Sequence, residues 1–165
     1  MQRSLEPELM DNLEQALAFH KANRDYGIQG FLELYNKHVS RSEGKIIDLG
    51  CGPGSYLFAL EEQHPQLSIT GYDGSEPMIQ IGRGVAEHRS SAVRLRHKQF
   101  KDITDTADCV ISTNTLHHLH DPTVFWDCVK RVSNRVFVMD LIRPANTVIA
   151  RRIVDTLARD DSVEF

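Results

Sequence analysis

The chain has 165 residues, of which 41% are hydrophobic and 25% charged, a size and balance typical of one globular domain that buries its own core. A formal net charge of −4 gives no overall electrostatic reason to expect nucleic acid as a partner. No run approaches the roughly 18 apolar residues of a membrane span, so we expect no membrane partner. The first residues carry acids where a signal peptide needs an apolar stretch, so we expect no secretory leader.

The cysteine content indicates a reducing compartment. Cys51, Cys109 and Cys128 lie inside predicted elements and show no CxxC spacing, which disfavours both a disulfide framework and a structural zinc site. We therefore expect a cytoplasmic protein without a metal site.

Two helices are predicted before the main domain. Residues 5–20 place leucines four apart, which is one apolar stripe of an amphipathic helix, at Leu5, Leu9, Leu13 and Leu17. Residues 28–39 show similar intervals. We interpret residues 1–43 as an N-terminal helical cover or lid, and residues 44–165 as the main domain. Tyr26 and Tyr35 could close over a ligand from this cover, or could equally be ordinary core or surface aromatics.

The pattern after residue 44 alternates strands with helices. Short apolar runs predict five strands, at residues 45–49, 67–72, 93–99, 107–113 and 135–141. The third of these is the most polar, as an edge position permits. The helices between and after them are predicted from residue 55, from a Ser75 cap, from Asp121-Pro122 and from Pro144. This alternation predicts an α/β fold with a doubly wound, mostly parallel sheet.

A glycine loop follows the first predicted strand. Gly50, Gly52 and Gly54 stand where the chain turns sharply and a ligand can approach the backbone. Asp73 follows the second strand, where a carboxylate can accept hydrogen bonds from the two hydroxyls of a ribose. A tight strand-to-helix turn would also explain the glycines, and a helix N-terminal acid would also explain Asp73.

Two details disfavour a dinucleotide in this loop. The GxGxxG fingerprint needs a glycine at position 55, which is Ser55. Asp48, two residues before the first glycine, would repel a pyrophosphate but would attract an ammonium group. A nicotinamide-dependent oxidoreductase is therefore disfavoured.

The segment DLGCGPG (48–54) with its downstream acid resembles the cofactor motif of class I, small-molecule methyltransferases that use S-adenosylmethionine. The resemblance, which covers about residues 44–159, implies a Rossmann-like fold and S-adenosyl-L-methionine as cofactor. It implies that Asp102 faces the adenine amino group, that Ile103 lies beside the ring, and that YDGSEPMI and STNTLHHL line the pocket. The cofactor-binding residues implied are Asp48, Gly50, Cys51, Gly52, Gly54, Asp73, Gly74, Ser75, Met78, Asp102, Ile103, Asn114 and Leu116.

The chain departs from that family at its C-terminal end. The family sheet normally continues after the fifth strand with an antiparallel hairpin, and the residues up to Phe165 leave no room for one. We therefore expect either a natural truncation or a fragment of a longer protein. The fifth strand would then be an apolar edge, for which we expect a homodimer that pairs or covers it.

The resemblance brings His117 and His118 to the methyl-transfer face, where an imidazole can act as a base for an acidic acceptor. Loop packing and surface exposure explain these histidines equally well, and a metal site at LHHLH is disfavoured for lack of a carboxylate or cysteine cluster. We therefore expect a methyltransferase acting on a small-molecule acceptor. The alternative is a non-catalytic module that binds S-adenosylmethionine or its demethylated product.

Overall fold

The computed structural model describes residues 9–23, 27–141 and 144–152. Within these ranges the chain forms five strands, five α-helices and one 3₁₀ helix, followed by a helical stretch at residues 147–152. In chain order the labelled elements are α1 (Leu13–Asn23), α2 (Ile28–His38), β1 (Glu43–Leu49), α3 (Ser55–Gln63), β2 (Gln66–Asp73), α4 (Glu76–Arg89), β3 (Arg94–His97), η1 (Phe100–Asp102), β4 (Cys109–Thr113), α5 (Thr123–Val132) and β5 (Val136–Met139).

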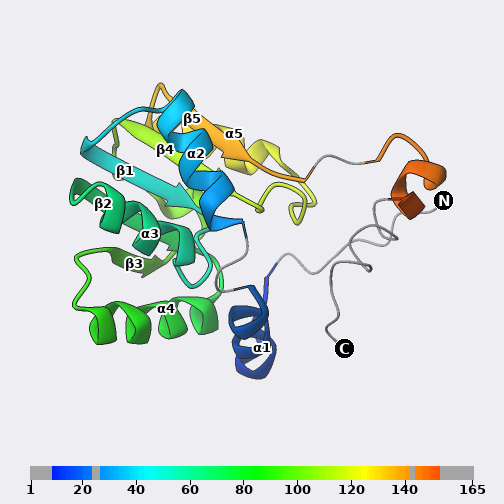
Figure 1. Cartoon of the computed structure of the whole chain (residues 1–165), viewed down its shortest axis with the longest axis horizontal. Helices are drawn as coiled ribbons and strands as arrows, with labels where there is room; N and C mark the ends of the chain where they lie inside the picture. The colour runs from blue at the N-terminus through cyan, green and yellow to red at the C-terminus, as the bar shows by residue number, and fades with distance from the viewer. Residues whose placement is uncertain (1–8, 24–26, 142–143, 153–165) are drawn as a thin grey trace.

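The strands form one parallel sheet in the order β3-β2-β1-β4-β5 (Figure 1). This confirms the predicted Rossmann-like, doubly wound α/β fold, with β3 at one edge and β5 at the other. The strand order reverses between β1 and β4, and ligands of such sheets bind outside the carboxyl ends of the strands at that point. The topology therefore indicates where a site belongs.

Two apolar clusters lie on opposite faces of the sheet, because successive strand side chains point to opposite sides. Ile46 joins the cluster formed with α2, α3 and α4, whereas Ile47 joins the cluster formed with α5. The helix α2 belongs to the core itself, since its Phe31 and Tyr35 are fully buried and contact the ring of Phe137 in β5. Tyr35 is thus a core residue, while Tyr26 lies outside the described residues.

The first helix begins later than its leucine pattern predicts. Asn12 caps the start of α1, because its Oδ1 accepts the N–H groups of Glu14 and Gln15. The helix packs against α4 (Figure 1) and buries Ala16, whereas Leu13 and Leu17 are 50% and 40% exposed. The predicted packed leucine stripe is therefore wrong over the described residues, and Leu5 lies outside them.

Three other predicted helix starts can be compared with the structure. Ser75 caps α4 by accepting the N–H of Met78, and Asp121 accepts the N–H of Thr123 at the start of α5. The last helical stretch is capped by Asn146, two residues after the predicted Pro144 start. Its Val148 and Ile149 are exposed, and the chain from residue 153 onward lies outside the described residues.

Within the described ranges, no helix combines the length and the apolar character needed to cross a bilayer. In the same part of the chain, no three His, Cys, Asp or Glu side chains gather closely enough to hold a metal ion.

Candidate cofactor and active site

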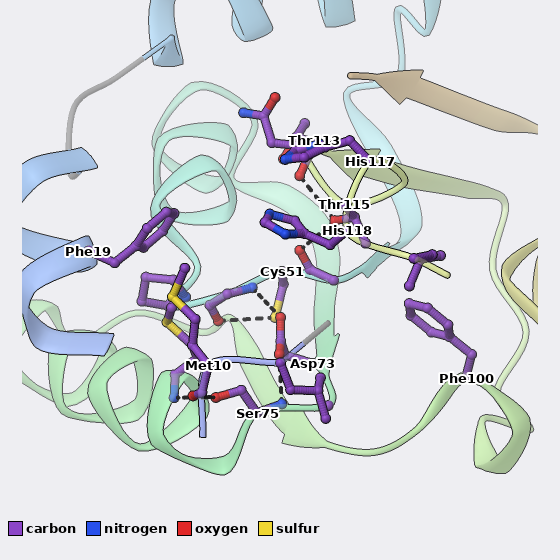
Figure 2. A pocket seen from close by; sticks show the side chains of 18 of the residues that line it. Met10, Phe19, Cys51, Asp73, Ser75, Phe100, Thr113, Thr115, His117 and His118 are labelled. Atoms are coloured by element: carbon purple, nitrogen blue, oxygen red, sulfur yellow. Dashed lines mark hydrogen bonds between the residues drawn. The ribbon is translucent and has the colours of Figure 1, made fainter. Parts of the chain in front are cut away.

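A cavity of about 510 Å³ opens at the carboxyl ends of the strands, beside the point where the strand order reverses. Its walls come from the loops after β1, β2, β3 and β4 and from the N-terminal segment. Figure 2 shows Asp73, His118 and Phe19 around this one hollow, although they come from three distant parts of the sequence. The strand ends at which the sequence predicts a ligand site therefore line a cavity.

The glycine loop brings its backbone to the cavity wall. Gly50 and Gly52 both have positive φ, 79° and 52°, a conformation that side chains other than hydrogen disfavour. A Cβ on Gly52 would meet no atom within 4 Å, so this position faces open space. A ligand can thus approach the Gly52 backbone closely.

Asp73 is tied to that loop. Its Oδ2 accepts the N–H of Gly52 at 2.7 Å, and its Oδ1 accepts the N–H of Ser75 at 2.8 Å. Burial raises the pKa of Asp73, and these two backbone hydrogen bonds partly counteract that rise. Each carboxylate oxygen keeps a second lone pair, so Asp73 can still accept hydrogen bonds from a ligand in the cavity.

Asp48 lies beneath the loop rather than on the cavity wall. It is 1% exposed, and among the described residues neither of its carboxylate oxygens has a hydrogen-bond partner. Burial raises the pKa of Asp48 well above its usual range, and the neighbouring Asp73 raises it further. Buried carboxyl oxygens without partners are rare, and this carboxyl lies directly before the glycine loop.

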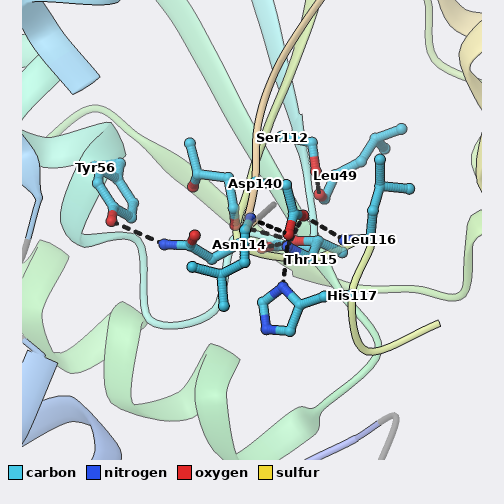
Figure 3. Close-up of polar contacts among 11 residues, drawn as sticks. Leu49, Tyr56, Ser112, Asn114, Thr115, Leu116, His117 and Asp140 are labelled. Atoms are coloured by element: carbon cyan, nitrogen blue, oxygen red, sulfur yellow. Dashed lines mark hydrogen bonds and ion pairs between the residues drawn. The ribbon is translucent and has the colours of Figure 1, made fainter. Parts of the chain in front are cut away.

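The loop after β4 is held by the strand beside it. Asp140, directly after β5, accepts the N–H groups of Thr115 and Leu116 on its Oδ2, at 2.9 and 2.7 Å (Figure 3). Asn114, at φ 52°, donates from Nδ2 to the hydroxyl of Tyr56 at 3.2 Å. The polypeptide between β4 and α5 therefore has a defined conformation where it passes the cavity.

Two histidines of this loop line the cavity. The Nδ1 atom of His117 lies 2.7 Å from Oδ1 of Asp140, and the rings of His117 and His118 have centroids 4.1 Å apart. His120 is exposed and lies outside the cavity wall. The arrangement supplies two imidazoles and one carboxylate at the edge of the hollow.

The N-terminal segment closes part of the cavity. Ser75 donates from Oγ to the carbonyl of Met10 at 2.5 Å, and Leu9 packs over Gly74, where an added Cβ would lie 2.7 Å from its Cδ2. Phe19 and His20 of α1 also line the wall. Residues before the sheet therefore contribute to the pocket.

A family model described as a methyltransferase domain matches residues 47–135, more than half of the 165 residues. The chain belongs to this methyltransferase family. The matched stretch runs from β1 to the end of α5 and so includes the glycine loop, Asp73 and both cavity histidines.

Curated relatives of this methyltransferase have different acceptors in their names. Trans-aconitate 2-methyltransferase of Mycolicibacterium gilvum is 33% identical over 95 residues, which cover 56% of this chain and 35% of that protein. Ribosomal RNA small subunit methyltransferase C of Actinobacillus pleuropneumoniae is 29% identical over 100 residues, covering 60% and 30% respectively. The chain therefore spans well under half the length of these relatives.

Solved structures share the fold of this methyltransferase. A Methanococcus maripaludis protein assigned as an S-adenosyl-L-methionine-dependent methyltransferase aligns with a TM-score of 0.73 at 18% identity, covering 98% of this chain and 76% of that one. The plantazolicin methyltransferase BpumL, solved with SAH, aligns with a TM-score of 0.67 at 20% identity, covering 94% and 60%.

The cavity brings together ten of the residues that the sequence singled out. These are Gly50, Cys51, Gly52, Asp73, Gly74, Ser75, Met78, Asn114, His117 and His118.

Five other residues that the sequence singled out lie off the cavity wall. Asp48 is beneath the loop, Gly54 precedes α3, Asp102 is exposed on η1, Ile103 is fully buried in the core, and Leu116 packs against the core cluster on the α5 face. The roles of all fifteen residues toward a cofactor or an acceptor stay predictions.

The sequence analysis missed several residues of the methyltransferase pocket. Gln99 and Phe100 enter it from the end of β3, and Tyr56 enters it from α3. Asp140 holds the histidine loop from the end of β5. The rule that ligands bind beyond the carboxyl ends of parallel strands pointed to the residues after β3 and β5, whereas nothing in the local sequence marks Tyr56.

Proposed function

We propose that this chain is the cofactor-binding domain of an S-adenosyl-L-methionine-dependent methyltransferase that acts on a small molecule. The observation that carries the proposal is the link between Asp73 and the Gly52 N–H, which joins a half-buried acid to a glycine loop at the sheet's reversal point. The SAH-bound structure of plantazolicin methyltransferase, which has the same fold, supports the choice of cofactor.

The residues present fit such a cofactor. The hydroxyls of its ribose can donate to Asp73, and the cofactor can approach the backbone of the glycine loop closely because no Cβ intervenes at Gly52. Asp48 lies off the cavity wall, so the ammonium contact expected for it is not part of this fit. When bound, the cofactor supplies an electrophilic methyl group on a sulfonium centre.

The chain's own contribution is to position an acceptor and exclude water. The cavity wall contains apolar side chains, among them Leu119, Val124 and Leu141, and the N-terminal segment also lines it. A concave, partly apolar cavity of about 510 Å³ suits a small acceptor better than a folded RNA. The net charge of −4 supports the same choice.

Calorimetry with S-adenosylmethionine, SAH and NAD tests the proposal. We expect micromolar binding of the first two and none of NAD, and absence of S-adenosylmethionine binding would refute the cofactor assignment. A screen with methyl-labelled cofactor against amines, phenols, alcohols, carboxylates including trans-aconitate, and ribosomal RNA then tests the acceptor class. Binding without transfer to any class would favour a non-catalytic module that binds the cofactor or its product.

We further propose that the protein is cytoplasmic and forms a homodimer through β5. All three cysteines are free and buried, as a reducing compartment allows. In the described part of the chain, β5 pairs only with β4, and its Val136 is 41% exposed. Sedimentation equilibrium at micromolar concentration tests the dimer, and a monomer there would contradict it.

A further inference from the structure

Asp140 receives hydrogen bonds on both carboxylate oxygens. Backbone N–H groups of Thr115 and Leu116 donate to Oδ2, and the N–H of Leu141 donates to Oδ1 at 2.7 Å. Oδ1 also lies 2.7 Å from the Nδ1 atom of His117. The carboxylate is thus surrounded by donors, and its position is fixed by the backbone rather than by the histidine.

This environment determines which nitrogen of His117 carries the hydrogen. A carboxylate that accepts backbone N–H groups on both oxygens acts as an acceptor, so Nδ1 of His117 must be the donor in their contact. In a neutral imidazole the other nitrogen, Nε2, then holds the lone pair. Figure 3 shows the ring with one nitrogen toward Asp140 and the other turned away from it.

We propose that Asp140 is a positioning residue that fixes His117 in the Nδ1–H form, so that its Nε2 takes a proton from the methyl acceptor. The inference rests on the proposed function, since it needs an acceptor in the cavity that His117 lines. As the proton leaves a hydroxyl group or a protonated amine, the electrons of the broken O–H or N–H bond stay on the acceptor atom as its attacking lone pair. The lone pair of Nε2 forms the new N–H bond, and the resulting imidazolium faces the Asp140 carboxylate.

The same geometry specifies a substrate class. A base is useful only where the reacting atom carries a proton at neutral pH, as in an amine or a hydroxyl group, and a carboxylate acceptor carries none. We therefore infer an acceptor with a reacting N–H or O–H group. The apolar side chains of Leu119 and Val124 on the same wall suit an acceptor with an apolar body.

A purely structural role for Asp140, holding the loop through Thr115 and Leu116, would leave the tautomer of His117 undefined. Nitrogen-15 NMR of histidine-labelled protein separates the two roles. We expect wild-type His117, assigned by its loss in His117→Gln, to show a protonated Nδ1 and an unprotonated Nε2. In Asp140→Asn we expect the population to shift toward the Nε2–H form.

Glu76→Gln is the matched control, because Glu76 lies 2.8 Å from Nδ1 of His97 on the surface of the molecule. This change should alter the His97 signals and leave those of His117 unchanged. A wild-type His117 protonated on Nε2 would overturn the proposal even if Asp140→Asn did not fold. A His117 spectrum identical in wild type and folded Asp140→Asn would also overturn it.

Kinetics test the proton transfer. With an amine or hydroxyl acceptor from the screen, we expect His117→Gln to lower kcat by about 10²–10⁴-fold while SAH affinity stays unchanged. An unchanged kcat, or a screen in which only carboxylates are methylated, would overturn the base role. Failure of the wild type to bind S-adenosylmethionine would instead refute the proposed function, and the tautomer measurement would still stand.

Discussion

The backbone of Gly50 packs directly against the side chain of Thr115. A Cβ at Gly50 would lie 2.3 Å from Thr115 Oγ1 and 2.4 Å from its Cγ2. Thr115 is buried and donates from Oγ1 toward the carbonyl oxygens of Gly50 and Thr113, each at 3.1 Å. The loop after β1 and the loop after β4 therefore pack so closely that no Cβ can be accommodated at position 50.

Alanine at the first two glycines should have different effects. Gly50→Ala forces the two loops apart and also strains the backbone at φ 79°, so we expect a loss of several kcal/mol of unfolding free energy. Gly52→Ala strains the backbone at φ 52° but meets no atom, so we expect a loss of about 1–2 kcal/mol and weaker S-adenosylmethionine binding. Urea unfolding and calorimetry measure both quantities. Equal losses of stability in the two variants would contradict the packing described for Gly50.

Replacing Asp73 by Asn should weaken the cofactor complex. The amide has only one acceptor oxygen and no charge, so it cannot serve both backbone N–H groups and a ribose. A lost charge-assisted hydrogen bond of about 1.5–3 kcal/mol lowers affinity by roughly 10–100-fold. The matched change is Asp127→Asn, an exposed acid of α5 outside the cavity wall, for which we expect unchanged affinity by calorimetry. Equal weakening by both changes would contradict the ribose contact proposed for Asp73.

The buried carboxyl of Asp48 should make stability depend on pH. Its pKa is raised in the folded state, so the folded chain holds a proton that the unfolded chain releases. Its contribution is therefore greatest below the unfolded pKa of about 4 and is lost as pH rises through the folded pKa. Asp48→Asn cannot ionise, so its unfolding free energy should fall less than that of the wild type over this range.

Urea unfolding of both proteins between about pH 4 and pH 8 measures this difference. Some fall should remain in the variant, because burial also raises the pKa of Asp73. Parallel pH profiles for wild type and Asp48→Asn would show that Asp48 is not buried as described.

Ser75 connects the N-terminal segment to α4, so its hydroxyl has two roles. It accepts the N–H of Met78 as a helix cap at 3.3 Å and donates to the carbonyl of Met10 at 2.5 Å. We expect Ser75→Ala to lower the unfolding free energy by about 1–2 kcal/mol and to increase hydrogen exchange at residues 10–20. Ser68→Ala, which removes only an exposed contact with Arg94, should change stability by less than about 0.5 kcal/mol. Unchanged exchange in Ser75→Ala would show that this hydrogen bond does not hold the segment.

Most of the sheet could be predicted because its signals are local. The apolar runs of β1 and β4 are buried on both faces, and the Ser75 and Asp121 caps lie next to the helices they begin. The leucine stripe failed because spacing does not show which face of a helix finds a partner. Ala16 is the buried position of α1, whereas Leu13 and Leu17 are exposed.

The sequence identified residues of the site where a single strand end marks them. Asp73 is the last residue of β2, and the glycines stand in the loop directly after β1. The partner of His117 could not be read locally, because Asp140 is 23 residues away and meets it only when β5 pairs with β4. Tyr56 likewise reaches Asn114 across 58 residues. Contacts between strand ends depend on sheet order, which no short motif encodes.

Asp140 directly follows β5, an edge strand of the sheet. Both cavity histidines belong to the loop whose backbone N–H groups donate to Asp140. Among the described residues β5 pairs with β4 alone, so the strand that carries Asp140 has a neighbour on one flank there. We expect a strand that pairs with the other flank to restrain Asp140 and the histidine loop, and fraying of β5 to loosen both.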